Sequence, residues 1–235
     1  MRKIQLKQVL RNKRFVLFTI ILPIGWYIFF YHLQKGVSPS ILLGIAVFIG
    51  VIGNSLATFS KRIASDIGFY SFESRFTSYS VKNYLWDQSI VQLIMNSLIF
   101  LAVLVVAVLG FHFPVTTSLL VQFFLLSLMG IYFSVIGFVL GVRVDAKTID
   151  TIGFPVIILA AMTIIPFDTL GASGGFMDLV GKLQRVFPGY YYTKLIQDLT
   201  EKQTIDVTQL ALFVAVFGVN LLFFYLLVPK GKMGN

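Results

Sequence analysis

Six apolar stretches occupy most of this 235-residue chain. A hydrocarbon core roughly 30 Å thick requires about 20 consecutive apolar residues in a helix. All the stretches except the short fifth come close to that length or exceed it. They are Phe15–Leu33, Pro39–Phe59, Ser89–Phe111, Thr117–Leu140, Ile152–Ile165 and Val207–Val228. We therefore expect an all-α polytopic membrane protein with six transmembrane helices.

The composition leaves no room for a separate soluble domain. Hydrophobic residues make up 57% of the chain and charged residues only 12%, far from the soluble average. The longest polar-leaning segments, 60–88 and 166–206, are each too short to enclose a core of their own. We expect residues 1–235 to form a single transmembrane domain.

The positions of Lys and Arg predict the orientation of the chain. If the N-terminus is cytoplasmic, 14 of the 19 Lys and Arg residues lie on the cytoplasmic side. These are Arg2, Lys3, Lys7, Arg11, Lys13, Arg14, Lys61, Arg62, Arg75, Lys82, Arg143, Lys147, Lys230 and Lys232. The acidic residues divide evenly, so the asymmetry is confined to the cations, as the positive-inside rule requires. We expect both termini in the cytoplasm, and we assign the net charge of +9 to topology and lipid contact rather than nucleic acid.

Residues 1–14 have the pattern of a helix that lies in the membrane interface. Leu6, Val9 and Leu10 share one helical face, while Lys3 and Arg14 belong to a basic face. Such a helix binds anionic lipid head groups. The alternative is a solvated basic tail that only sets the topology.

Two stripes of small residues predict close helix contacts. Gly50 and Gly53 belong to one stripe in the second span, and Gly130, Ser134, Gly137 and Gly141 form another in the fourth. Small residues at intervals of three and four allow membrane helices to approach closely. The stripes predict either packing within one bundle or a seam between two copies.

The six predicted spans contain no Asp, Glu, Lys or Arg. Ion-coupled pumps usually need an ionisable group inside the membrane. The polar groups that could line a pathway are amides, namely Gln92, Asn96 and Asn220, and the alternative role for each is a hydrogen bond between helices. Any uphill transport should therefore draw its energy from outside the membrane.

The chain has no recognisable catalytic or metal-binding motif. There is no G-x-x-x-x-G-K-[ST] phosphate-binding loop, no cysteine, and only two histidines, which are far apart. We expect a protein that is not an enzyme and that binds neither a metal nor a nucleotide itself.

The predicted cytoplasmic loop, residues 60–88, is unusually aromatic. Charged residues alternate with the aromatics, a mixture typical of protein docking surfaces; the alternative is an aromatic belt in the lipid interface. The candidate docking residues are Asp66, Gly68, Phe69, Tyr70, Phe72, Glu73, Arg75, Phe76, Tyr79 and Tyr84.

The fifth span is short and is followed by two amphipathic segments. Fourteen residues cover only about 21 Å as a straight helix, so part of 166–206 either re-enters the membrane or lies outside it. The segments 177–188 and 189–199 read as a pair of short helices. Re-entrant backbone requires partners within the protein.

The chain resembles the permease subunits of ABC-2 type exporters. The six-span layout, the basic N-terminal segment, the long loop after span two and the series Pro155, Pro166, Pro188 and Tyr190 carry the resemblance. Asp66-Ile-Gly68 stands where that family has Glu-x-Gly, and Thr77–Ser80 where it has Thr-Pro-x-Ser. The resemblance implies that Pro155, Pro166, Pro188 and Tyr190 form an extracellular gate. It also implies that residues 66–84 couple the permease to an ATPase.

By that resemblance we expect one half of the membrane pathway of an ABC exporter in a bacterial cell membrane. A second permease copy, identical or related, would complete the pathway. Two copies of a separate ATPase subunit would carry ATP and Mg²⁺. The apolar interior favours a hydrophobic or amphipathic cargo such as a drug, peptide or lipid. The alternatives are an ion-coupled secondary carrier and a membrane anchor or sensor subunit that transports nothing.

Overall fold

The computed structural model describes residues 16–33, 36–73, 81–165, 174–201 and 204–227, together with residues 11, 76 and 167. Within these residues the regular structure is entirely helical. Its elements are the π-helix η1 (Leu17–Ile21), α3 (Leu22–Leu33), α4 (Pro39–Ile52), the π-helix η2 (Gly53–Phe59), α5 (Ser60–Glu73), α6 (Val81–Phe111), α7 (Ser118–Arg143), α8 (Ala146–Met162), α9 (Gly175–Gln184), α10 (Pro188–Glu201) and α11 (Val207–Leu226). The all-α expectation holds for this part of the chain. The interfacial helix predicted for residues 1–14 lies outside it, apart from Arg11.

Helix α4 is the centre of the bundle. It begins after Ser38, whose side chain accepts a hydrogen bond from the Ser40 N–H at 3.3 Å, and Pro39 occupies the first helical position, as is common at helix starts. Helices α3, α6, α7, α8 and α10 all contact it. Because α4 is enclosed on all sides, its apolar residues from Ile41 to Phe48 are all buried.

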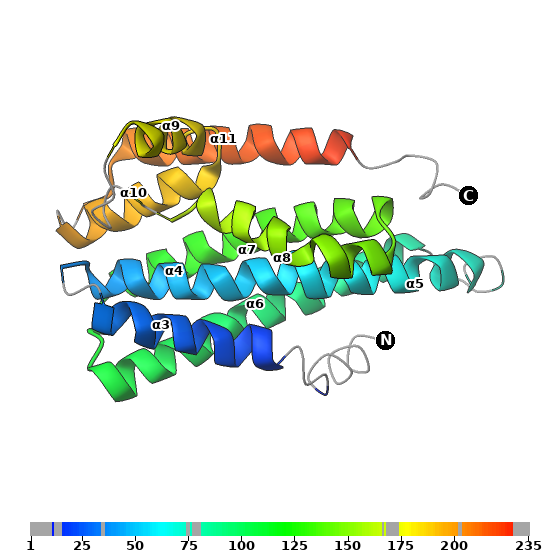
Figure 1. Ribbon diagram of the computed structural model, residues 1–235, viewed down its shortest axis with the longest axis horizontal. Helices are drawn as coiled ribbons and strands as arrows, with labels where there is room; N and C mark the ends of the chain where they lie inside the picture. Colours follow the sequence, from blue (N-terminus) through cyan, green and yellow to red (C-terminus); the bar gives the residue numbers. More distant parts are fainter. Residues whose placement is uncertain are drawn as a thin grey trace.

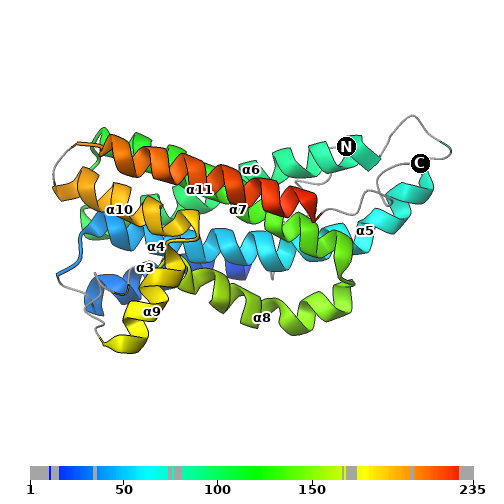
Figure 2. The same ribbon diagram turned by 90° about the horizontal axis from the view of Figure 1, so that it is seen from above.

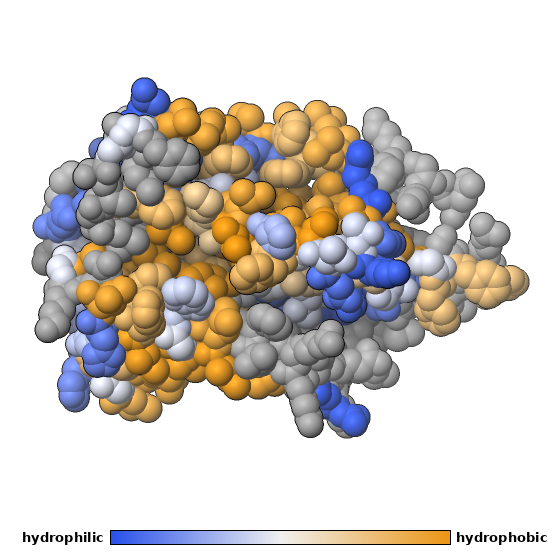
Figure 3. Space-filling view, in the orientation of Figure 1, coloured by the Kyte–Doolittle hydropathy of each residue, from blue (hydrophilic) through white to orange (hydrophobic). Residues whose placement is uncertain are grey.

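The long helices run back and forth along one axis, so the connections gather at two ends of the bundle (Figures 1 and 2). One end, which we call the hairpin end, has the end of α5, the start of α6 and the α7–α8 connection. The other, the cap end, has α9, α10 and the α3–α4 and α6–α7 connections. Figure 3 shows mostly apolar surface between polar residues near the two ends. This distribution is the one that a bundle spanning an apolar layer requires.

Four segments of the described chain are long and apolar enough to cross a membrane: Pro39–Phe69, Trp86–Phe111, Ser118–Arg143 and Val207–Leu226. Thr19–Leu33 is a shorter apolar helix, and α8 has 17 residues. The count of six spans and the side on which each end lies stay predictions.

Two expectations about element boundaries were wrong. Residues 60–88 are not a loop, because α5 continues the second span as far as Glu73 and α6 already begins at Val81. The helix that contains the predicted fifth span, Ile152–Ile165, also has other bounds than that segment. Helix α8 starts six residues earlier, at Ala146, where Asp145 accepts a hydrogen bond from the Thr148 N–H, and it passes through Pro155 without ending. The two short helices predicted in 177–199 are present as α9 and α10.

Glycines of α7 pack directly against the backbone of η2 and α5. A Cβ atom on Gly137 would lie 2.1 Å from the carbonyl oxygen of Ser55, and one on Gly141 would lie 2.5 Å from that of Ser60. Gly50 makes a similar contact with Pro23 and Ile99, whereas Gly53 has no such neighbour within 4 Å. The small-residue stripe of α7 therefore serves contacts within this chain, and a seam between copies stays a prediction.

The contact at Gly137 yields a stability prediction. Gly137→Ala should lower the free energy of unfolding by about 1–3 kcal/mol, because the new methyl group forces two backbones apart. Gly218→Ala in α11 is the matched control, since nothing lies within 4 Å of its added Cβ and alanine favours a helix by roughly 0.5–1 kcal/mol over glycine. Thermal unfolding in detergent measures both, and equal melting temperatures for the two variants would contradict the close contact.

Candidate functional site

The hairpin end carries the aromatic residues that the sequence marks as a docking surface. Helix α5 extends past the ends of α7 and α8 (Figures 1 and 2). Phe69 and Phe72 are each 62% exposed and Phe76 is 74% exposed. The rings of Phe72 and Phe76 lie 5.1 Å apart. We call these three residues the hairpin aromatics.

The other docking candidates are placed only in part. Asp66 and Gly68 lie on α5, half-buried and exposed respectively. Arg75 and Tyr79 lie outside the described residues, and for Tyr70, Glu73 and Tyr84 only the helical backbone is described.

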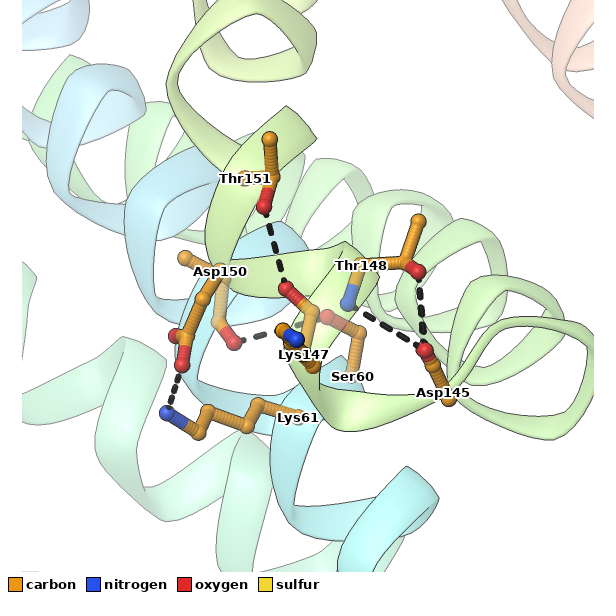
Figure 4. A network of polar contacts seen from close by, with 8 residues as sticks. Ser60, Lys61, Asp145, Lys147, Thr148, Asp150 and Thr151 are labelled. Carbon is orange, nitrogen blue, oxygen red and sulfur yellow. Dashed lines mark hydrogen bonds and ion pairs between the residues drawn. The ribbon is translucent and has the colours of Figure 1, made fainter.

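One ion pair joins α5 to the start of α8, and hydrogen bonds within each of the two segments lie beside it (Figure 4). Lys61 forms the ion pair with Asp150, and Ser60 donates a hydrogen bond to the Leu56 carbonyl in the adjoining η2. Asp145 accepts hydrogen bonds from both the N–H and the hydroxyl of Thr148, the latter at 2.7 Å. The base of α5 is thus attached to a second helix.

A group of hydrogen-bonded amides and hydroxyls lies inside the bundle, where η2, α6 and α7 meet. Its members, which we call the amide cluster, are Asn54, Ser55, Gln92, Asn96 and Ser134. Asn54 Nδ2 donates to Asn96 Oδ1 at 3.1 Å, and Gln92 Nε2 donates to Ser55 Oγ at 3.1 Å and to Asn96 Oδ1 at 3.4 Å. Two predicted pathway residues, Gln92 and Asn96, are therefore neighbours in one buried network.

The amide cluster is attached to the hairpin end through Arg62. Arg62 Nη2 donates to Gln92 Oε1 at 3.3 Å, and its guanidinium lies over the Phe59 ring at 5.6 Å. The sequence assigned Arg62 only a role in topology, and no periodicity pointed to this contact. The cluster can also accept a further hydrogen bond, because Asn54 Oδ1 is buried with no hydrogen-bond partner among the described residues.

Two residues of the cluster belong to η2. A π-helical segment inside an α-helix frequently marks a functional position. Here η2 spans Gly53–Phe59 between α4 and α5, and it supplies Asn54 and Ser55.

A groove of about 690 Å³ lies beside the amide cluster, between α6 and α7. We call it the α6–α7 groove. Asn96 and Ser134 contribute polar groups to it, and Asn83 and Ser89 are polar residues nearer the hairpin end. The remaining lining residues are apolar: Phe59, Trp86, Ile90, Leu93, Ile94, Ile131, Val135 and Phe138. The arrangement can bind a mostly apolar molecule that has a small polar group.

Asn220, the third predicted pathway residue, lies apart from the other two. Its Oδ1 accepts a hydrogen bond from the Tyr132 hydroxyl at 3.3 Å, and its Nδ2 donates to the Val186 carbonyl at 3.0 Å. Asn220 therefore connects α11 with α7 and with the turn after α9. That all three amides line a pathway stays a prediction.

Side chains at the cap end form hydrogen bonds with the carbonyls at the end of the short helix α8. Gln184 Nε2 donates to the carbonyls of Met162 at 2.6 Å and Ile165 at 2.8 Å, and the Thr193 hydroxyl donates to that of Ile164 at 3.1 Å. Carbonyls at a helix end have no partners within the helix, and α9 and α10 provide them here.

The predicted gate residues do not all lie together. Pro188 is buried at the start of α10, and Tyr190 lies near it, with Arg185 and Lys194 each 5.9 Å from its ring centre. Pro155 is exposed in the middle of α8, seven residues before its end. Pro166 lies outside the described residues. The geometry thus groups only Pro188 and Tyr190 at the cap end.

The described residues contain no cluster of three His, Asp or Glu side chains that could hold a metal ion. The polar chemistry of the site is therefore that of amides, hydroxyls and one guanidinium.

Comparisons with known proteins add no relative to this picture. No protein-family model, no curated protein and no solved structure matches the chain.

The amide cluster yields a second stability prediction. Gln92→Leu should lower the free energy of unfolding by about 1–3 kcal/mol, because it removes the acceptor for Arg62 and the donor to Ser55 and Asn96. Gln197→Leu on α10 is the control, since its side chain bonds only to Glu201 and that contact is exposed. Thermal unfolding in detergent compares the two variants. If Gln92→Leu and the control have equal melting temperatures, the hydrogen-bond network contributes little to stability.

Proposed function

We propose that this protein is the membrane subunit of an ATP-driven exporter, acting with a second permease copy and two copies of a separate ATPase. The observation that carries the proposal is the hairpin end, where α5 projects from the apolar bundle with its aromatic residues exposed. The resemblance to ABC-2 permeases, described from the sequence, implies that this surface binds an ATPase.

The exposed aromatics are costly to leave in water and suit a protein contact. Burying a large side chain is worth about 1.5–3 kcal/mol, and interfaces are enriched in aromatic residues. Phe69 and Phe72 lie on the helix α5 rather than on a loop, so an ATPase would meet a helical surface there. Asp66 lies on the same helix.

The path from this surface to the bundle interior is short. Helix α5 continues η2 and α4 with no break, and Arg62 on α5 contacts Gln92 of the amide cluster. Movement of an ATPase bound at the hairpin aromatics would therefore act directly on the polar groups beside the α6–α7 groove. Closure of the ATPase pair would shift the balance between two arrangements of the helices.

The sequence has no nucleotide-binding motif, so we expect the energy source on another chain. No phosphate-binding loop occurs in the 235 residues, so ATP would be bound and hydrolysed by the partner. This chain would supply the path and the docking surface.

A docking variant tests the proposal. Phe72→Ser should weaken recovery of a Walker-motif ATPase with the tagged full-length chain by roughly tenfold, the loss expected for a moderate interface residue of about 1.4 kcal/mol. Leu183→Ser on α9 is the control, because Leu183 is similarly exposed, at 57%, but lies at the cap end. The measurement is mass spectrometry of complexes purified from the native membrane in mild detergent.

Reconstitution supplies the functional readout. Vesicles with the chain and its ATPase should accumulate an apolar cargo only with ATP, and Phe72→Ser should abolish this while Leu183→Ser retains it. A wild-type chain that recruits no such ATPase under any mild detergent would overturn the proposal.

A further inference from the structure

One hydrogen-bond donor on the wall of the α6–α7 groove has no partner among the residues that the structure describes. Asn96 is 8% exposed and is part of the groove wall. Its Oδ1 already accepts from Asn54 and Gln92, so the orientation of the amide is fixed by two donors. Among the described residues nothing accepts a hydrogen bond from its Nδ2, which lies close to Gly130 on the facing helix. A donor left unpaired in apolar surroundings costs about 1–3 kcal/mol.

The size of the groove suits a drug-sized molecule. From Asn83 to Asn96 the groove follows 13 residues of α6, or about 20 Å at 1.5 Å per residue. Its volume of about 690 Å³ lies within the range of about 300–1,000 Å³ that is typical of sites for drug-sized molecules.

The depth of Asn96 disfavours a bilayer lipid. Asn96 follows Trp86, where the apolar span of α6 begins, by ten residues, which places it about 15 Å further along the helix. Lipid ester groups lie at the edge of the hydrocarbon layer, and an acyl chain beyond them has no acceptor. A lipid chain in the groove would therefore leave the Asn96 donor unpaired.

The aromatic residues that line the groove favour ligands with flat rings. Phe59, Trp86 and Phe138 contribute aromatic surfaces to the groove, and aromatic pairs gain about 0.5–1.5 kcal/mol beyond the burial of their area. The groove therefore combines aromatic walls with one deep donor.

From these features we propose that the α6–α7 groove binds an uncharged, drug-sized aromatic compound whose carbonyl oxygen accepts a hydrogen bond from Asn96 Nδ2. Such a compound partitions into the bilayer and reaches the groove from the lipid. As a binding site, the groove needs no ATPase. Only the further statement that this compound class is the exported cargo rests on the proposed function.

Photolabelling of the purified full-length chain tests the site without any ATPase. The chain is placed in phosphatidylcholine nanodiscs and irradiated with benzophenone, an uncharged aromatic ketone, and labelled peptides are identified by mass spectrometry. Labels should concentrate on the groove-lining segments of α6 and α7. Even labelling of all exposed apolar helices, α11 included, would overturn the proposal.

Two non-photoreactive competitors isolate the hydrogen bond. Fluorenone and fluorene have the same ring framework, but fluorene has a CH₂ group in place of the carbonyl. Fluorenone should displace the groove label at about tenfold lower concentration, the effect of one hydrogen bond of about 1.4 kcal/mol. Equal displacement by the two competitors would show that no donor is engaged.

Variants assign the site to particular residues. Asn96→Leu should remove the difference between fluorenone and fluorene, provided that size-exclusion chromatography shows a folded protein. Leu93→Trp should fill the groove and abolish its label. Leu101→Trp on the same helix is the control, because Leu101 is similarly exposed, 48% against 45% for Leu93, but lies outside the groove, and it should keep the label.

The remaining outcomes are equally decisive. If Leu93→Trp and Leu101→Trp label alike, the compound lies in bulk lipid and the proposal fails. If a cross-link between two copies forms across the groove and benzophenone never enters, a second copy covers this face and the proposal fails as well. If groove binding holds but no ATPase is recruited, the binding site stands and the exporter proposal is the part that is lost.

Discussion

The close approach of α7 to η2 and α5 is the contact on which the other features depend. Without side chains at Gly137 and Gly141, the α7 backbone lies against the carbonyls of Ser55 and Ser60. This proximity places Ser134 of α7 3.5 Å from Ser55 of η2, and it holds Gly130 against Asn96. The amide cluster and the wall of the α6–α7 groove therefore both result from two missing side chains. Because the energy comes from packing between backbones, it does not require any difference in polarity between protein and lipid.

The second constraint is that polar backbone must be satisfied inside an apolar medium. Helix α8, with 17 residues, covers about 26 Å, less than the roughly 30 Å of a hydrocarbon layer. Gln184 and Thr193 donate to three carbonyls at that end, so the chain can leave the helix early. Tyr192 and Gln122 complete the attachment of α10 to the centre of the bundle. The helices α9 and α10 thus supply hydrogen-bond donors to the end of α8, which its short length would otherwise leave without partners.

The sequence was sufficient to predict the helical class and most of the apolar helices, because their hydrophobic runs are long and uninterrupted. The sequence did not predict the helix at 60–73, because its aromatic and charged residues interrupt the hydrophobic pattern. This helix, α5, continues α4 and η2 along the chain. Arg62 was assigned to topology, since a sequence pattern cannot show that a long side chain reaches back to Gln92. Asn220 resembled Asn96 in every sequence property, yet only the packing of α11 determines that it meets Tyr132. The partners of interior amides depend on rotation and register between helices, which hydropathy does not encode.

The absence of a break between α4 and α5 has a mechanical consequence. A loop absorbs displacement through its own soft dihedrals, whereas an uninterrupted helix transmits bending and torsion along its length. The π-helical turn at Gly53–Phe59 is the point in this rod with one extra residue per turn, so a local return to ordinary α-helical winding would rotate everything beyond it by about 100° per residue absorbed. A torque on α5 would therefore act first on this segment, which contains Asn54 and Ser55 of the amide cluster.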